Sequence, residues 1–197
     1  MTRTTLKWAD KTLVTRAEGI CYVENFMSRT VADEWLDLFR TNLLDSWQSE
    51  KFSIFGKEVR APRTLCWFGE KGLNYRYAGN NHCAQGWPQF CKPLLRSVEH
   101  ATRMRFNFLL VNRYLDGKQY MGWHKDDEKG ASPRIASLSL GASRRFLIET
   151  SAGRQEQTLG HGSLLIFDGR MRHQLPKSTR IDQERLNLTF RYVEPSI

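Results

Sequence analysis

Residues 122–130, with the sequence GWHKDDEKG, concentrate side chains that could bind a cation. His124 and Asp126 are separated by one residue, so an extended backbone places their imidazole and carboxylate on the same face. Both groups are ordinary ligands of divalent metals. A pair of this kind also occurs in a solvated acidic turn at the end of a surface strand. A third ligand is therefore needed to define a metal site.

The other four histidines are the candidates for that third ligand. His100 lies within a predicted helix, His82 in a polar loop, and His161 between two glycines in a predicted turn. His173 follows a predicted strand and turn in the C-terminal half, where a distant strand can return beside the first pair. Two histidines and one carboxylate form the facial triad of non-haem iron(II) oxygenases. The competing metal is zinc, but the spacing of the four cysteines gives no support for a structural zinc site.

A second polar group lies on one face of the last predicted strand, RLNLTFR. Its polar residues alternate with apolar ones and are Arg185, Asn187, Thr189 and Arg191. An earlier strand candidate likewise places Asn112 and Tyr114 on one face. One interpretation is a strand with a solvated face. The other is a cavity wall for a small acid, because arginine binds a carboxylate through two parallel hydrogen bonds.

Strands are the main elements that must position these side chains. After residue 105 the chain contains short strand candidates separated by turn residues, namely FNFLLVNRYL, IASLSLG, RRFLIET, SLLIFDG and RLNLTFRYV. Many short, closely spaced strands are typical of a sandwich or a jelly roll. Glycine-punctuated, aromatic segments at residues 52–80 predict hairpins and loops.

Two helices are predicted before this β-rich region. Residues 28–44 have helical spacing of apolar residues, including Leu38, and Thr30 with Asp33 resembles a capping box. Residues 92–104 predict a second helix whose buried face includes Ala101. The expected fold class is therefore α+β and mainly β, with two N-terminal helices packed against a jelly-roll core.

Composition limits the class of protein. The 197 residues fit one domain, and no apolar run reaches the length of a membrane span, so we expect no membrane association. The N-terminus has no signal-peptide pattern, and the four cysteines form no C-x-x-C pair, so we expect reduced thiols inside the cell. The net charge of +9 favours a polyanionic partner such as nucleic acid, although many soluble proteins are simply basic.

Four motifs, in this order, resemble the AlkB family of iron(II)- and 2-oxoglutarate-dependent dioxygenases: NRYLDGKQYMGWHKDDE, IASLSLG, HGSLLIF and RLNLTFR. The resemblance runs from about residue 22 to residue 193 and is closest to homologues that repair double-stranded DNA. It implies a single domain over residues 1–197 with a double-stranded β-helix core at 105–193. Nucleotide-recognition hairpins would occupy residues 50–80, and about residues 1–21 would be an N-terminal extension.

The resemblance also implies roles for individual residues. His124, Asp126 and His173 would hold Fe(II). The residues at the positions where the family contacts 2-oxoglutarate are Asn112, Tyr114, Arg185, Asn187, Thr189 and Arg191. Among them, Arg191 would pair with the carboxylate distant from the metal, and Arg185 would lie near the other end of the cosubstrate.

The remaining implied roles concern DNA. Tyr75 and Tyr77 would line a pocket for a flipped base, and Glu128 would lie beside that base and favour a cationic lesion. Ile54 and Phe55 would form an apolar finger that enters the base stack. The surrounding basic residues that could hold phosphates are Lys51, Lys57, Arg60 and Arg63.

The reaction implied is oxidative demethylation of 1-methyladenine and 3-methylcytosine in DNA, with duplex DNA expected as the substrate, O2 consumed, and formaldehyde, succinate and CO2 released. We expect a monomer, cytoplasmic in a bacterium or nuclear in a eukaryote. Two alternatives remain open at this point. One is an RNA demethylase of the same family, and the other is a catalytically silent, metal-stabilised module that binds nucleic acid.

Overall fold

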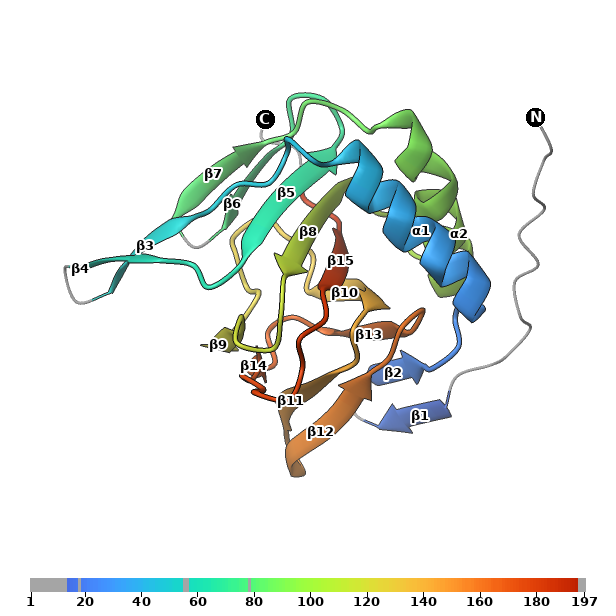
Figure 1. Cartoon of the computed structure of the whole chain (residues 1–197), viewed down its shortest axis with the longest axis vertical. Coiled ribbons are helices and arrows are strands. Elements are labelled where there is room, and N and C mark those ends of the chain that lie inside the picture. The colour runs from blue at the N-terminus through green and yellow to red at the C-terminus, as the bar shows by residue number, and fades with distance from the viewer. Residues whose placement is uncertain (1–13, 18, 55–56, 78, 195–197) are drawn as a thin grey trace.

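Two antiparallel β-sheets dominate the computed structural model, which describes residues 14–17, 19–54, 57–77 and 79–194 (Figure 1). The larger sheet consists, in spatial order, of β1 (Val14–Ala17), β2 (Ile20–Val23), β13 (Leu164–Asp168), β10 (Arg134–Gly141), β15 (Arg185–Arg191), β8 (Phe108–Tyr114) and β5 (Thr64–Gly69). The smaller sheet consists of β12 (Gly153–Leu159), β11 (Arg144–Thr150), β14 (His173–Leu175) and β9 (Met121–His124). All five strand candidates after residue 105 are confirmed.

Two predicted helices are also confirmed, as α1 (Arg29–Asn42) and α2 (Lys92–Thr102), the latter preceded by a 3-10 turn, η1 (Gln89–Cys91). The predicted capping box is wrong, because Thr30 already lies inside α1. Ser28 is the N-cap instead, and its hydroxyl oxygen accepts a hydrogen bond from the Val31 N–H at 3.3 Å. Leu38 and Ala101 are exposed, contrary to expectation. Leu38 lies on the flank of the buried stripe of α1, and Ala101 lies in the last turn of α2.

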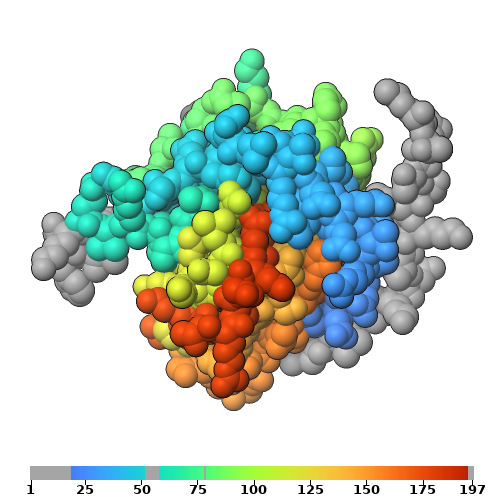
Figure 2. Space-filling view, in the orientation of Figure 1, coloured from blue at the N-terminus to red at the C-terminus, as the bar shows by residue number. Residues whose placement is uncertain are grey.

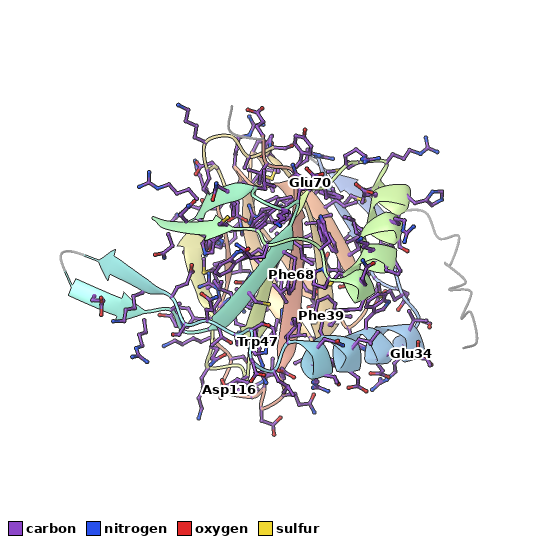
Figure 3. The ribbon with its side chains drawn as sticks, turned by 90° about the horizontal axis from the view of Figure 1, so that it is seen from above. Glu34, Phe39, Trp47, Phe68, Glu70 and Asp116 are labelled. Carbon is purple, nitrogen blue, oxygen red and sulfur yellow. The ribbon has the colours of Figure 1, made fainter. Side chains whose placement is uncertain are left out.

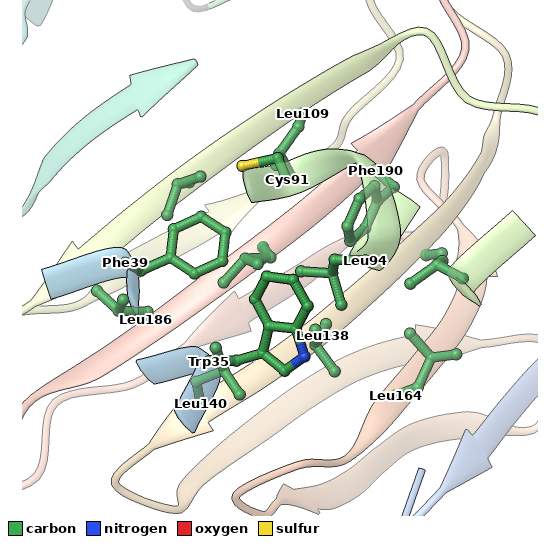
Figure 4. Packing of buried hydrophobic residues seen from close by; sticks show 14 of the residues in the cluster. Trp35, Phe39, Cys91, Leu94, Leu109, Leu138, Leu140, Leu164, Leu186 and Phe190 are labelled. Atoms are coloured by element: carbon green, nitrogen blue, oxygen red, sulfur yellow. The ribbon is translucent and has the colours of Figure 1, made fainter. Parts of the chain in front are cut away.

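The helices cover one face of the larger sheet, where the main hydrophobic core lies (Figure 4). Trp35 and Phe39 from α1 and Leu94 from α2 pack against apolar residues of the sheet. From β15 these are Leu186, Leu188 and Phe190, all fully buried. The alternation read from the sequence is therefore confirmed: the apolar face of β15 meets the helices, and its polar face is left for the other side of the sheet.

Two separate hairpins lie within residues 50–83. β3 (Lys51–Ile54) pairs with β4 (Lys57–Arg60), and β6 (Asn74–Tyr77) pairs with β7 (Asn80–Cys83). The β3–β4 hairpin extends away from the two sheets in Figures 1 and 3, and it stands out from the rounded body in Figure 2. Neither α1 nor α2 has the length and apolar character needed to cross a membrane.

Candidate active site

A cavity lies between the two sheets. The polar face of β15 forms one wall, and β9, β11 and β14 of the smaller sheet contribute to the opposite wall. The lining contains every residue that the sequence indicates for the metal and the small acid, namely Asn112, Tyr114, His124, Asp126, His173, Arg185, Asn187, Thr189 and Arg191. Segments that are far apart in the chain therefore meet here.

The two histidines and the aspartate converge on one point. β14 pairs with β9 so that His173 lies directly opposite His124. Nε2 of His124 lies 3.7 Å from Oδ1 of Asp126, and Nε2 of His173 lies 3.5 Å from Oδ2 of Asp126. One potential ligand atom from each of the three residues lies within 4.8 Å of the other two. The predicted return of a distant strand to the H-x-D pair is thus confirmed.

Backbone carbonyls orient both imidazoles. Nδ1 of His124 lies 2.8 Å from the carbonyl oxygen of Gly122, and Nδ1 of His173 lies 2.7 Å from that of Met171. Because a carbonyl oxygen only accepts, each Nδ1 carries the proton in a neutral ring, and each Nε2 keeps its lone pair. This is the usual arrangement of metal-binding histidines. Both lone pairs are therefore available on the side where Asp126 lies.

The charge states of His124 and Asp126 also suit a cation. Burial, reinforced by His173, lowers the pKa of His124 to about 4, so its imidazole is neutral at neutral pH. Burial alone would raise the pKa of Asp126, but Arg191 and the two histidines outweigh it and hold that pKa below its usual range. Asp126 is 5% exposed, and its Oδ1 has no hydrogen-bond donor among the described residues. A buried, ionised oxygen beside two imidazole lone pairs fits a divalent metal such as iron(II).

Gly169 allows Asp126 to approach the β-core. The Asp126 N–H donates to the Gly169 carbonyl oxygen at 2.8 Å. A Cβ atom at position 169 would lie 2.6 Å from Cδ1 of Ile135 and 2.7 Å from the carbonyl oxygen of Asp126. Such distances are too short for carbon, so only glycine fits without displacing the metal-binding segment.

Arg191 lies at the metal end of the cavity. Its Nη2 donates to Oδ2 of Asp126 at 2.6 Å, and its Nη1 lies 4.0 Å from Oε2 of Glu128. The same guanidinium lies over the ring of Tyr75, 5.3 Å from the ring centroid. The expected pairing of Arg191 with the cosubstrate carboxylate distant from the metal stays a prediction, and the contact with Asp126 favours a role at the metal end instead.

Arg185 lies at the opposite end of the same strand face. The two arginines are six positions apart along an extended strand, roughly 20 Å of backbone. Arg185 is 1% exposed, and its Nε and Nη1 have no hydrogen-bond acceptor among the described residues. Burial lowers its pKa to about 10, so it remains charged at neutral pH. A buried guanidinium with two unused donors is a suitable site for a carboxylate.

The residues expected to bind the base lie beside the metal end. Tyr75 and Tyr77 are both buried on the same face of β6, with ring centroids 6.1 Å apart and ring planes inclined by 21°. Tyr77 lines the cavity. The Tyr75 hydroxyl donates to Oε2 of Glu128 at 2.8 Å, and burial raises the pKa of Glu128. The structure therefore brings these three residues together next to Arg191.

The structure does not test the apolar finger. Phe55 lies outside the described residues, and of Ile54 the backbone alone is described, as the last residue of β3. The last pair of the hairpin joins Ile54 to Lys57. The phosphate role proposed for Arg63 is wrong, because Arg63 is 2% exposed and lines the cavity. Arg63 lies among other basic residues in the sequence, and this pattern does not predict its burial.

One further polar residue of the site, Ser137, and one buried arginine outside the cavity lining, Arg144, were missed in the sequence. Ser137 lines the cavity, and its Oγ accepts a hydrogen bond from Nδ2 of Asn187 at 2.7 Å. Strict alternation along IASLSLG would have identified Ser137 as a cavity residue. Arg144 is 1% exposed and donates to four backbone carbonyls, including those of Gln119 and Pro176 at 2.9 Å and 2.8 Å. No local pattern distinguishes it from its exposed neighbour, Arg145.

Comparisons with known proteins agree with this geometry. Residues 19–191 match the model of the 2OG-Fe(II) oxygenase superfamily. The chain is 31% identical over 196 residues to the human DNA oxidative demethylase ALKBH2, covering 90% of this chain and 75% of that protein. It is 38% identical over 156 residues to the mouse alpha-ketoglutarate-dependent dioxygenase alkB homolog 3, covering 68% of this chain and 52% of that protein. The solved structure titled "The structure of OsALKBH1" matches 92% of this chain with a TM-score of 0.66 at 16% identity, a likeness of fold.

The chain is thus a member of the 2OG-Fe(II) oxygenase superfamily, whose model spans nearly the whole chain. Within that superfamily, the identity to ALKBH2 over most of both chains makes this protein a member of the AlkB family. The predicted family is therefore confirmed. Fe(II), 2-oxoglutarate and O2 are the cofactor and cosubstrates of this superfamily, and His124, Asp126 and His173 are the residues placed to hold the metal.

Proposed function

We propose that this protein is a DNA repair dioxygenase that oxidatively demethylates N-alkylated bases such as 1-methyladenine and 3-methylcytosine. The observation that carries the proposal is the triad of His124, Asp126 and His173 in a buried cavity whose other end holds Arg185, with two donors that no acceptor among the described residues uses. The names of the relatives, DNA oxidative demethylase among them, support DNA as the substrate.

The metal and the protein have different roles in the proposed reaction. Bound iron(II) would activate O2, one oxygen atom of which oxidises 2-oxoglutarate to succinate and CO2 while the other converts the N-methyl group of the base to a hydroxymethyl group. The hydroxymethyl group then leaves as formaldehyde. The protein positions the reactants: the base lies against Tyr77, and the cavity walls exclude water from the reacting groups.

The two arginines of β15 lie at opposite ends of the bound cosubstrate. Arg185 pairs with the carboxylate distant from the metal, because its free donors lie at the far end of the cavity. Arg191 holds Asp126 and lies near the carboxylate that approaches the metal. Asn112, Tyr114, Asn187 and Thr189 complete the polar wall around the cosubstrate.

Glu128 selects cationic lesions. Methylation at N1 of adenine or N3 of cytosine gives the base a positive charge, which a partly buried carboxylate stabilises more strongly than it would in water. We expect Glu128→Gln to lower kcat/KM for 3-methylcytosine about tenfold and to affect a neutral etheno adduct much less. Rates on the two lesions in the same duplex sequence measure this difference. Equal losses on both lesions would instead assign Glu128 a structural role through its hydrogen bond with Tyr75.

The β3–β4 hairpin opens duplex DNA. The hairpin extends away from the two sheets, and Lys51 pairs with Arg60 at the end of the hairpin nearest to them. Ile54 ends β3 and Phe55 follows it in the sequence, and apolar side chains there would fill the gap left by a flipped base.

For this hairpin, the double variant Ile54→Ala/Phe55→Ala should lose about tenfold in demethylation rate on a duplex, because unpairing costs on the order of a few kcal/mol. The same lesion in a single strand should be repaired at nearly the normal rate. Rates on both substrates, with the exposed Val59→Ala as control, test the role. A similar loss on both substrates would place the two residues in the core.

The two sheets form, in this proposal, the double-stranded β-helix of one domain, with the hairpins of residues 50–80 as its nucleotide-recognition part. The cavity between the sheets supports this view. We also propose that the protein acts as a monomer, since all the residues of the proposed site come from one chain.

The substrate is tested by measuring formaldehyde and the restored base with 3-methylcytosine in duplex DNA, single-stranded DNA and RNA of the same sequence. The proposal requires turnover on DNA, fastest on the duplex. Turnover confined to RNA would make the protein an RNA demethylase. Binding of all three without turnover in the presence of Fe(II) and 2-oxoglutarate would make it a silent binding module.

A further inference from the structure

Arg63 contacts two other residues of the cavity lining, Asn112 and Tyr77. It lies just before β5, is 2% exposed and lines the cavity together with Asn112 and Tyr77. Its Nε donates to Oδ1 of Asn112 at 2.6 Å, and its Nη2 donates to the hydroxyl of Tyr77 at 3.3 Å. One rigid, planar group therefore contacts a residue of the cosubstrate wall and a residue of the base pocket.

The contact with Arg63 decides which way the Asn112 amide points. A guanidinium has donors and no acceptor, so the Asn112 atom at 2.6 Å must be the oxygen and not the nitrogen. The group that Asn112 can offer to a ligand in the cavity is consequently its NH2 donor. A carboxylate only accepts hydrogen bonds, so this orientation is the one that binds 2-oxoglutarate.

We propose that Arg63 is a positioning residue for the cosubstrate, which holds the Asn112 amide with its NH2 group toward the 2-oxoglutarate carboxylate. This inference rests on the proposed function, because it assigns the polar wall near Asn112 to 2-oxoglutarate. Without Arg63 the amide can rotate by 180° and present its oxygen, which repels a carboxylate.

The surroundings of Arg63 allow its removal to be tested. The nearest acid is Glu50, whose Oε2 lies 4.0 Å from Nη2 of Arg63. Glu50 is also bound to His82, whose Nε2 lies 2.6 Å from Oε1. Glu50 therefore keeps a close partner when Arg63 is replaced, and a buried carboxylate is not left alone.

A double-mutant cycle separates positioning from a general structural effect. The dissociation constant of 2-oxoglutarate is measured by calorimetry with Mn(II) in place of iron, for the wild type, Arg63→Met, Asn112→Ala and the double variant. Each single change should weaken binding about tenfold, as loss of one hydrogen bond to a charged ligand does. The double variant should bind 2-oxoglutarate no more weakly than the single variant with the lower affinity, because Arg63 acts through Asn112.

The exposed Arg76→Met, on β6 between the two tyrosines, is the matched control and should bind 2-oxoglutarate normally. Should Arg63→Met not fold, Arg63→Lys replaces it in the cycle, since lysine keeps the charge without the planar fork. Multiplicative losses of about 100-fold in the double variant, or normal binding by Arg63→Met, would overturn the inference. Failure of the wild type to bind 2-oxoglutarate would overturn the proposed function itself.

Discussion

Asp126→Ala is expected to abolish metal binding and turnover. Asp126 supplies the only carboxylate of the triad, and its Oδ1 is a buried oxygen without a hydrogen-bond donor among the described residues. Alanine leaves only the two imidazoles, which hold iron(II) poorly, and it also releases Arg191 from its 2.6 Å contact. Since the loss of a group that merely supports a ligand costs about 10- to 100-fold, we expect more than 100-fold here.

Mn(II) affinity and formaldehyde release measure the two effects separately. The adjacent Asp127→Ala is the matched control, because Asp127 is exposed and is not part of the triad. Alanine at His124 or His173 should behave like Asp126→Ala. Normal Mn(II) affinity in all three variants would remove the triad from the metal site.

Arg185→Met should raise the 2-oxoglutarate concentration needed for half-maximal rate about 100-fold, with metal affinity unchanged. Arg185 is fully buried, and its Nε and Nη1 face no acceptor among the described residues. Loss of two hydrogen bonds to a desolvated carboxylate accounts for an effect of this size. Arg185→Lys should recover part of the affinity, because lysine keeps the charge but cannot form the planar pair of bonds.

The 2-oxoglutarate dependence of the rate is the measurement, and the exposed Arg180→Met is the control. Arg191→Met is the informative comparison, because Arg191 contacts Asp126 and should alter metal affinity as well. If Arg191→Met raised the cosubstrate requirement alone while Arg185→Met left it normal, the two arginines would have to exchange roles.

Patterns along single strands predicted much of the site. The H-x-D spacing and the alternation along RLNLTFR depend on the two-residue period of a strand, which holds wherever a strand forms. The polar residues of β15 consequently face the cavity and its apolar residues face the helices, as expected.

Features set by tertiary contacts could not be predicted in this way. Arg63 and Arg144 lie in sequence stretches with exposed basic residues, and their burial depends on partners 49 and 32 residues away, Asn112 and Pro176. The two ends of β15 look alike in the sequence, so the motif alone could not tell which arginine lies near the metal. Only the approach of Asp126 to Arg191 distinguishes them.

The central claim is that methylated DNA is oxidised in this cavity at the expense of 2-oxoglutarate. Succinate formation is measured with Fe(II), 2-oxoglutarate and O2, in the presence of duplex DNA with a single 3-methylcytosine or of the same duplex without the methyl group. The methylated duplex should stimulate succinate formation well above the unmodified one, with formaldehyde in equal amount, and Asp126→Ala should show neither product. Succinate formation that is the same with and without the methyl group, in an enzyme that binds iron and 2-oxoglutarate, would contradict the account.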